Sequence, residues 1–280
     1  MRIEHASPSP LLRPHIDRYW WCTADAQPLP RLLPGTGGEL WIRTAGAIEA
    51  RADGDPVPRP LPDAHLVCLR RTRWTLAARA PAAFVAVRFR AGALGRFIGV
   101  GVDAVADRVV DAEELWGAAG RRLAEEVRCA AGTAAQRAVL ESHLTGLLAA
   151  GRAPAPAVDA AVRLLYHRPA ELPTGRLAAH LDVSPRLLQR HFPAVVGAGP
   201  KEFQRIARFQ RLTRSLLLAG RTDYLPAALD AGYFDQSHVI REYRRIGGDR
   251  PSVLLGGGLS HFYYEPLDGP GQNRVRPDRR

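Results

Sequence analysis

Ser184-Pro-Arg-Leu-Leu-Gln-Arg-His-Phe192 is the most informative segment for the architecture of the second half of the chain. Ser184 can accept the unpaired backbone N–H groups at the start of a helix, and Pro185 fits the first helical position. Leu188 and Phe192 are four residues apart and therefore share one buried face. The opposite face carries arginine and glutamine, which match the edges of guanine and adenine. The stretch predicts a short amphipathic helix, residues 184–196, suited to the major groove of DNA.

A second stretch, Asp235-Gln-Ser-His-Val-Ile-Arg-Glu-Tyr243, repeats this pattern about fifty residues later. Its apolar side chains are expected to pack inward, namely Val239, Ile240 and Tyr243. Its polar side chains are expected to face outward, namely Gln236, Ser237 and Arg241. Two such helices at this spacing are much stronger evidence than one, because each follows a tight turn from another short helix.

The segment between the two stretches predicts a rigid connector. Residues 201–218 have helical periodicity, and 18 residues at ~1.5 Å each span ~27 Å. Such a helix could hold the two predicted DNA-contacting helices, residues 184–196 and 235–246, about one turn of B-DNA apart, which is ~34 Å. We call these two the reading helices. The connector's arginines drift around its surface, so most are expected to be solvated: Arg205, Arg208, Arg211 and Arg214.

Caps and turns define the remaining helices of this half. A helix is expected from Pro156 to His167, followed by a short one at 177–181 capped by Thr174. Asp182 tolerates the left-handed turn before the first reading helix. The second unit would begin with Thr222 or Asp223 as its cap and would be stopped by the Gly-Gly pair at 247–248, before a last short helix at 251–255.

Composition favours a polyanionic partner without proving one. The chain has 280 residues, enough for two domains, and a formal net charge of +11. Nearly all of the positive charge is arginine, since Lys201 is the single lysine; a GC-rich genome accounts for most of this bias. Residues 155–280 hold 19 Arg and Lys against 12 Asp and Glu, so the excess coincides with the helical patterns.

Cysteine usage and hydropathy favour a cytoplasmic protein. Cys22, Cys68 and Cys129 are far apart, without metal-ligand spacing, and an odd count without a signal peptide suggests a reducing compartment. No apolar run approaches the ~18–20 residues that a membrane span needs.

The first half predicts short strands followed by helices. Residues 1–18 are interpreted as an irregular lead-in, and strands are expected at 39–43, 65–70, 74–77 and 84–90. The last of these alternates, which predicts a strand with one buried face. Frequent turns suggest a sandwich or small barrel. Helices are expected at 92–99, at 112–117 and as a pair over 119–150, where an apolar stripe at 139–148 is either intramolecular core or a dimer interface.

Catalytic motifs are missing from this half. There is no G-x-S-x-G, HExxH or glycine-rich phosphate loop, and His5, His15 and His65 are isolated, so neither a metal nor a cofactor is expected. Cys68 is expected to be a buried apolar residue. A ligand pocket could use tryptophans that are equally explained as core, namely Trp20, Trp21, Trp41 and Trp74. The sequence names no ligand.

The second half resembles the paired helix-turn-helix domain of the AraC/XylS transcriptional regulators. The likeness is carried by Leu177-Ala-Ala-His-Leu-Asp-Val-Ser-Pro-Arg-Leu-Leu-Gln-Arg-His-Phe192, by Ala227-Ala-Leu-Asp-Ala-Gly-Tyr-Phe-Asp-Gln-Ser-His-Val-Ile-Arg-Glu-Tyr243, and by the Gly247 and Pro251 that follow. It covers about residues 157–255. A weaker likeness to the β-rich sensor domains of some of these regulators is carried by 34–42, 84–94 and 115–116.

The resemblance implies which residues contact DNA. In the first reading helix they are Arg186, Gln189 and Arg190; in the second they are Gln236, Ser237 and Arg241, with His238 adjacent. Three positions depart from the family pattern: Asp182 stands where glycine is frequent, Phe234 where a small capping residue is common, and Val239 where an aromatic is frequent. Asp235 is available to take over the cap.

Together these observations predict an α+β chain. Residues 1–150 would form a β-barrel or cupin-like domain with trailing helices, used for effector sensing or dimerisation. Residues 151–156 would be a linker, 157–255 an all-α domain of two helix-turn-helix units joined by a long helix, and 256–280 a disordered basic tail.

The expected function is that of a bacterial, sequence-specific transcriptional regulator and not of an enzyme. Its expected partners are double-stranded DNA, a small-molecule effector of unknown identity, RNA polymerase, and a second copy of the chain. The alternative is a small-molecule-binding module, or an enzyme, whose helical appendage contacts proteins.

Overall fold

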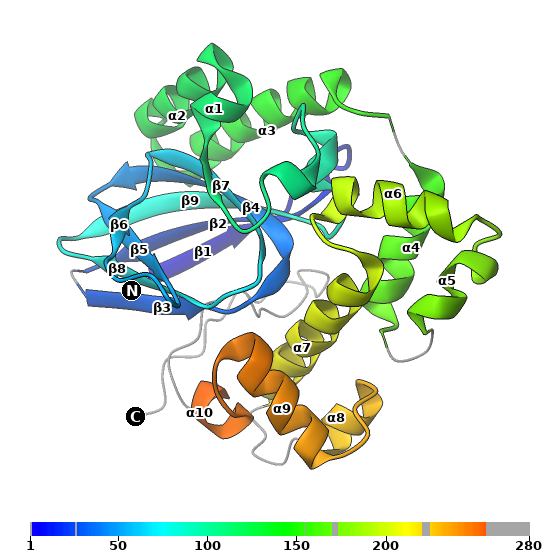
Figure 1. Cartoon of the computed structure of the whole chain (residues 1–280). Helices are drawn as coiled ribbons and strands as arrows, with labels where there is room; N and C mark the ends of the chain where they lie inside the picture. Colours follow the sequence, from blue (N-terminus) through cyan, green and yellow to red (C-terminus); the bar gives the residue numbers. More distant parts are fainter. Residues whose placement is uncertain (1, 26, 154, 170–172, 220–224, 256–280) are drawn as a thin grey trace.

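The computed structural model describes residues 2–25, 27–153, 155–169, 173–219 and 225–255, which form a β-rich N-terminal part and a helical C-terminal part (Figure 1). The strands are β1 (Arg2–Ala6), β2 (Ile16–Ala24), β3 (Gln27–Leu32), β4 (Gly35–Ala45), β5 (Ile48–Ala52), β6 (Arg59–Pro60), β7 (Ala64–Arg70), β8 (Trp74–Ala78), β9 (Ala82–Phe89) and β10 (Val109–Asp111).

The remaining elements of the described residues are two short 3-10 turns and the α-helices. They are η1 (Leu94–Arg96), η2 (Val102–Ala104), α1 (Ala112–Trp116), α2 (Ala118–Cys129), α3 (Gly132–Ala150), α4 (Pro156–His167), α5 (Thr174–His180), α6 (Pro185–Val196), α7 (Pro200–Ala219), α8 (Leu225–Asp230), α9 (Gln236–Gly247) and α10 (Pro251–Leu255). The α+β class is therefore confirmed. The tail at 256–280 and the expected cap at 222–223 lie outside the described residues.

The strands form two facing sheets and not a closed barrel. The six-stranded sheet has the order β1-β2-β9-β4-β7-β10, and the four-stranded sheet has the order β3-β8-β5-β6. This agrees with the expected sandwich and corrects the expected barrel. It also corrects the irregular lead-in: β1 pairs antiparallel with β2 from Arg2↔Thr23 to Ala6↔Tyr19. Prolines between these two strands obscured a pairing that depends on distant residues.

Both faces of the six-stranded sheet are buried. Val85 and Val87 of β9 pack under the helices, whereas Phe84 and Ala86 pack against the second sheet. The prediction of one buried face for this strand was therefore wrong. Between the sheets, Trp41 stacks on Phe84 with ring centroids 4.4 Å apart. The four candidate pocket tryptophans are all core residues, with at most 9% of their surface exposed.

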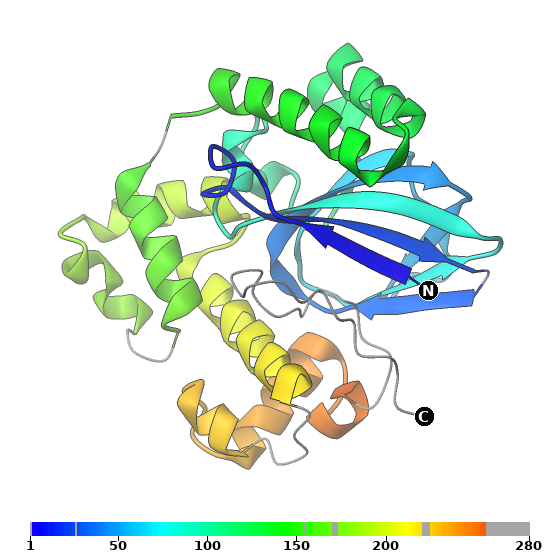
Figure 2. The ribbon, with the colours of Figure 1, turned by 180° about the vertical axis from the view of Figure 1, so that it is seen from behind.

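Helices α1–α3 cover the outer face of the six-stranded sheet (Figures 1 and 2). Leu140 and Leu144 of α3 are fully buried there, so the apolar stripe is intramolecular core. The helix pair at 119–150 is confirmed, but the helix expected at 92–99 shrinks to the three residues of η1. Gly92 has a left-handed φ of 81°, and a Cβ there would lie 2.9 Å from Val162, so the chain turns sharply at this point.

The C-terminal helices follow the predicted pattern closely. Helix α4 begins at Pro156 and ends at His167, as expected. Thr174 is the first helical residue of α5 and not its cap. Pro173 occupies the capping position, and its side chain accepts no hydrogen bond from the first turn. Asp182 has the expected left-handed φ of 51°.

The two parts of the chain are joined by shared cores and by specific polar contacts. One apolar cluster contains Trp41 of β4 together with Phe209 of α7 and Tyr243 of α9. Arg71, just after β7, donates from Nε to Glu202 Oε1 (2.8 Å) and from Nη2 to Glu202 Oε2 (3.2 Å). The reading units therefore pack directly on the β-rich part.

Candidate nucleic-acid interface and a neighbouring pocket

Helix α6 is built from local signals at both ends. The Ser184 hydroxyl accepts a hydrogen bond from the Leu187 backbone N–H at 3.1 Å, and Pro185 opens the helix. Gly197 closes it with a left-handed φ of 82°. Phe192 is fully buried against Phe203 of α7, with ring centroids 5.5 Å apart in an edge-to-face arrangement. These contacts fix which face of α6 points outward.

The outward face of α6 carries its three sequence-predicted residues. Arg186, Gln189 and Arg190 are all exposed. Arg186 and Arg190, one turn apart, form no ion pair or hydrogen bond with the residues that the structure describes. Their guanidinium groups are therefore available for the phosphates or guanine edges of a duplex.

Helix α9 repeats this construction. The Asp235 carboxylate accepts from the His238 backbone N–H at 2.7 Å, so Asp235 does take over the cap. Val239 and Tyr243 are fully buried, and the Tyr243 hydroxyl lies 2.9 Å from Thr213 Oγ1 on α7. Ile240 is only half-buried.

The outward face of α9 carries Gln236, Ser237 and Arg241, all of which are exposed. His238 is placed differently from these three. It is half-buried, and its ring stacks on Phe234 (5.7 Å) and meets Tyr233 edge-on (5.2 Å). It therefore braces the start of α9 while staying next to the reading face.

Sequence reasoning treated Phe234 only as a departure from a capping pattern. Phe234 is 85% exposed at the turn before α9. The sequence did contain a hint of this exposed ring, because an aromatic residue stands directly before the cap Asp235 where the family commonly has a small residue.

The connector α7 carries both reading helices on one continuous element of 20 residues, about 30 Å long. Its arginines are not mostly solvated. Arg205 approaches Glu242 of α9 at 3.9 Å, Arg208 donates to the Pro169 carbonyl at 3.2 Å, and Arg211 donates to the Tyr166 carbonyl at 3.4 Å. These contacts tie α7 to neighbouring segments, because an arginine head can reach carbonyls one helix away.

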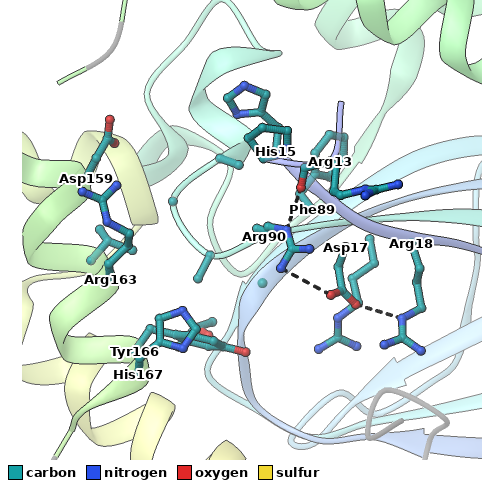
Figure 3. A pocket seen from close by; sticks show the side chains of 18 of the residues that line it. Arg13, His15, Asp17, Arg18, Phe89, Arg90, Asp159, Arg163, Tyr166 and His167 are labelled. Atoms are coloured by element: carbon teal, nitrogen blue, oxygen red, sulfur yellow. Dashed lines mark hydrogen bonds and ion pairs between the residues drawn. The ribbon is translucent and has the colours of Figure 1, made fainter. Parts of the chain in front are cut away.

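A cavity of about 960 Å³ lies between one end of the six-stranded sheet and helices α4 and α7. Figure 3 shows residues of the sheet side facing Asp159, Arg163, Tyr166 and His167 of α4 across the space. Its lining contains an unusual number of arginines, namely Arg13, Arg18, Arg88, Arg90, Arg96, Arg163 and Arg214. Among the described residues, Asp17 and Asp159 are the carboxylates in this lining.

The electrostatics of this pocket are dominated by positive charge. Burial and the nearby Arg96 lower the pKa of His15. Burial and three neighbouring arginines lower the pKa of His167, so both rings stay neutral near pH 7. Burial acts to raise the pKa of Asp17, but the arginines around it outweigh burial and lower this pKa overall. Sequence reasoning missed the pocket because each arginine alone is indistinguishable from a surface residue.

Within the described segments, no helix is long and apolar enough to cross a membrane. In the same segments, no group of three or more His, Cys, Asp or Glu residues is arranged to hold a metal ion.

Known families and solved structures match both halves of the chain. The family described as "Helix-turn-helix domain" matches residues 177–256, and the "Domain of unknown function (DUF6597)" matches residues 4–111. A structure of ToxT from Vibrio cholerae in a P21 form is similar with a TM-score of 0.51 at 11% identity, covering 85% of this chain and 98% of that one. An apo ToxT variant from Vibrio cholerae strain SCE256 gives 0.50 at 12% identity, covering 86% and 98%. No curated relative matches the chain.

Two capped helices with polar outer faces on one connector, matched by a helix-turn-helix family, define a DNA-binding transcriptional regulator. Its domain over residues 177–256 is of the AraC type, and the chain as a whole has the fold of ToxT. The chain thus joins an AraC-type helix-turn-helix domain to a β-rich N-terminal part.

Proposed function

We propose that this protein controls transcription by reading two successive major grooves with residues 184–196 and 235–246. In each reading helix, arginine would contact guanine or phosphate and the shorter polar side chains would contact base edges. The proposed contacts are those of the outward faces: Arg186, Gln189, Arg190, Gln236, Ser237 and Arg241, with His238 beside them.

The observation that carries this proposal is the matched exposure of the two helices. Each turns its buried side to α7 and leaves its arginines in solvent. Because α7 spans about 30 Å, it supports a separation close to the ~34 Å of one turn of B-DNA. Arginine and glutamine also occur on helix faces that contact only water. Such a role would not explain why two capped helices with similar outer faces are held on one connecting helix.

The proposal divides the chain into a sensing and a reading part. Residues 1–150 would sense a small-molecule effector, and 157–255 would bind DNA after a linker at 151–156. The cavity between the sheet and helices α4 and α7 supports an effector, since it touches both parts. RNA polymerase and a second copy of the chain are further proposed partners, and the cytoplasm is the proposed compartment.

The rival is a module, or an enzyme, whose helix-turn-helix units contact proteins. Phosphate contacts release counterions, so the logarithm of a DNA-binding constant falls linearly with the logarithm of salt concentration. A steep slope supports DNA reading, whereas the rival requires a slope near zero.

The decisive experiment selects genomic fragments with the purified full-length protein and then measures the affinity of variants for those fragments. Arg190→Ala and Arg241→Ala should each cost about 1–3 kcal/mol per broken base contact. Arg122→Ala is the matched control, because Arg122 is an exposed arginine on α2 of the β-rich part. Unchanged affinity in both reading-helix variants, with unfolding also unchanged, contradicts the proposal.

A further inference from the structure

Phe234 stands in the turn between α8 and α9, directly before the cap of the second reading helix. It is 85% exposed, the largest exposed fraction among the large apolar residues that the structure describes. Single apolar residues on a surface are common and need no explanation by themselves. An aromatic residue that lies almost entirely in solvent beside a proposed DNA-reading face does need one, and its contacts supply the evidence.

The usual structural role of an apolar residue at this position is not filled here. An apolar side chain just before a helix cap often packs on the fourth residue of the helix, which fixes the entry of the chain. In α9 that fourth residue is Val239, which is fully buried, whereas Phe234 remains in solvent. The preceding residue, Tyr233, is 3% exposed and belongs to the same apolar cluster as Val239. The core is therefore covered without Phe234.

The ring of Phe234 is nevertheless held in a defined orientation. It lies nearly parallel to the His238 imidazole, with 20° between the planes and 5.7 Å between the centroids. The Phe234 backbone N–H also donates to His238 Nδ1 at 3.4 Å. The same imidazole meets the buried Tyr233 edge-on at 5.2 Å, which ties it to the core. A ring that is ordered before binding loses less entropy in any contact that it makes.

The ring stands at the end of α9 that a major groove would receive. The opposite end of α9 abuts the β-rich part, since a Cβ added to Gly248 would lie 3.3 Å from Asp53 Oδ2. Helix α9 has 12 residues and is about 18 Å long, so its first turn lies away from the two sheets (Figure 1). In helix-turn-helix proteins the N-terminal residues of the reading helix contact base edges. Phe234 is thus placed next to the exposed Gln236 and Ser237.

We infer that Phe234 contacts the C5-methyl group of a thymine in the operator and so favours thymine at one base pair of the sequence read by α9. This methyl group is the apolar feature that the major groove displays, and phenylalanine is among the side chains that contact it. The inference rests on the proposed function, to which it adds a residue that determines specificity. Arginine and glutamine would read polar base edges, and this ring would read an apolar one.

A protein partner is the other class of molecule that an exposed ring could contact. Leu225 and Leu229 of α8 are 38% and 51% exposed, so apolar surface also occurs on the neighbouring helix. Charge favours DNA, because the exposed residues of α9 that follow Phe234 are all polar or positively charged, as a surface facing phosphates requires. They are Gln236, Ser237, Arg241, Arg244 and Arg245.

The test measures how strongly binding depends on single thymine methyl groups. Each thymine of the selected operator is replaced in turn by deoxyuridine, which removes only the methyl group, and the affinity of the full-length protein is measured by fluorescence anisotropy. Loss of one buried methyl group corresponds to about fourfold weaker binding. We expect a loss of about this size at one thymine. If every uracil-containing operator binds as tightly as the original, the inference is overturned.

Variants identify the residue that contacts the methyl group. Phe234→Ser should bind the thymine and uracil operators equally, whereas Phe234→Leu keeps an apolar side chain and should keep part of the difference. Leu229→Ser is the matched control, because Leu229 is an exposed apolar residue on α8, and it should keep the full difference. Thermal unfolding checks that the variants fold. If the difference persists unchanged in Phe234→Ser, another residue contacts the methyl group and the inference fails.

A methyl group on a different base separates methyl contact from the other features of thymine. At the sensitive position, 5-methylcytosine paired with guanine should bind about fourfold more tightly than cytosine paired with guanine. Phe234→Ser should remove this gain. A wild-type protein that does not distinguish these two operators contradicts the inference.

The inference and the proposed function can fail separately. Selection of DNA without a methyl-sensitive thymine overturns the role of Phe234 and leaves the regulator function in place. If the protein selects no DNA, both are overturned. If methyl groups do not affect binding but Phe234→Ser abolishes transcription with purified RNA polymerase, the ring contacts that protein and the inference fails.

Discussion

Breaking the ion pair between Arg71 and Glu202 should loosen the junction between the β-rich part and the first reading unit. The Arg71 guanidinium donates to both carboxylate oxygens, and its Nη2 also donates to the Gly197 carbonyl at 3.1 Å. The two side chains are 36% and 32% exposed. The substitutions Arg71→Ala, Glu202→Ala and their combination form a double-mutant cycle around this contact.

The magnitude follows from geometry and solvent access. Two unit charges about 4 Å apart attract by roughly 4 kcal/mol at an effective dielectric constant of about 20. Partial exposure and the cost of ordering two long side chains reduce this to a coupling energy of about 1 kcal/mol. Arg71→Ala should cost about 0.5–1.5 kcal/mol more than Glu202→Ala, because it also removes the partner of the Gly197 carbonyl.

Urea denaturation followed by tryptophan fluorescence measures each variant. The apolar cluster that contains both Trp41 and Tyr243 runs through both parts, so one cooperative transition is expected. A coupling below about 0.3 kcal/mol at low salt lies within ordinary additivity. Such a coupling, or a smaller loss for Arg71→Ala than for Glu202→Ala, would show that this ion pair does not stabilise the junction.

Two further predictions concern a buried histidine and a helix cap. Burial lowers the pKa of His65 from 6.5 to about 4, so the folded state binds fewer protons than the unfolded chain between these values. The stabilisation that neutral His65 gives the folded state is complete above about pH 6.5 and is lost as the pH falls toward 4, by up to ~3 kcal/mol. His65→Gln should therefore flatten the dependence of the free energy of unfolding on pH in this range, measured by denaturation at several pH values. An unchanged slope would contradict this role of His65. Asp235→Ala should lower the free energy of unfolding by about 1 kcal/mol. Asp235→Ser keeps a capping oxygen and should lower it less. Equal losses for the two variants in equilibrium denaturation would exclude a capping role for Asp235.

The reading helices could be predicted from sequence because their signals are local. A cap, a proline at the first position and apolar residues four apart all lie within nine residues of Ser184. In α9 the cap Asp235 and the apolar pair Val239 and Tyr243 lie equally close together, without a proline. The turn residue Asp182 adopts the left-handed conformation that its short polar side chain allows. Helices whose caps, turn residues and apolar pairs lie close together in the chain can therefore be predicted from the sequence.

The first strand and the pocket could not be predicted because they depend on distant pairings. Residues 2–6 become a strand only beside β2, and the prolines that follow them suggested irregular chain. Arg18, Arg88 and Arg214 are brought together by the strand order and by the packing of α7. Nothing near any one of these arginines distinguishes it from a solvated side chain.

The shared cores of this chain have a consequence for the operators that it can recognise. The first reading unit packs on Leu69 of the β-rich part through one apolar cluster, and the second packs on the sandwich through another. Both units are thus anchored to the same scaffold as well as to α7. If both helices contact DNA as proposed, their separation is fixed, because neither helix can shift without exposing core residues. We then expect weaker binding to sites whose two halves are one base pair closer together or further apart.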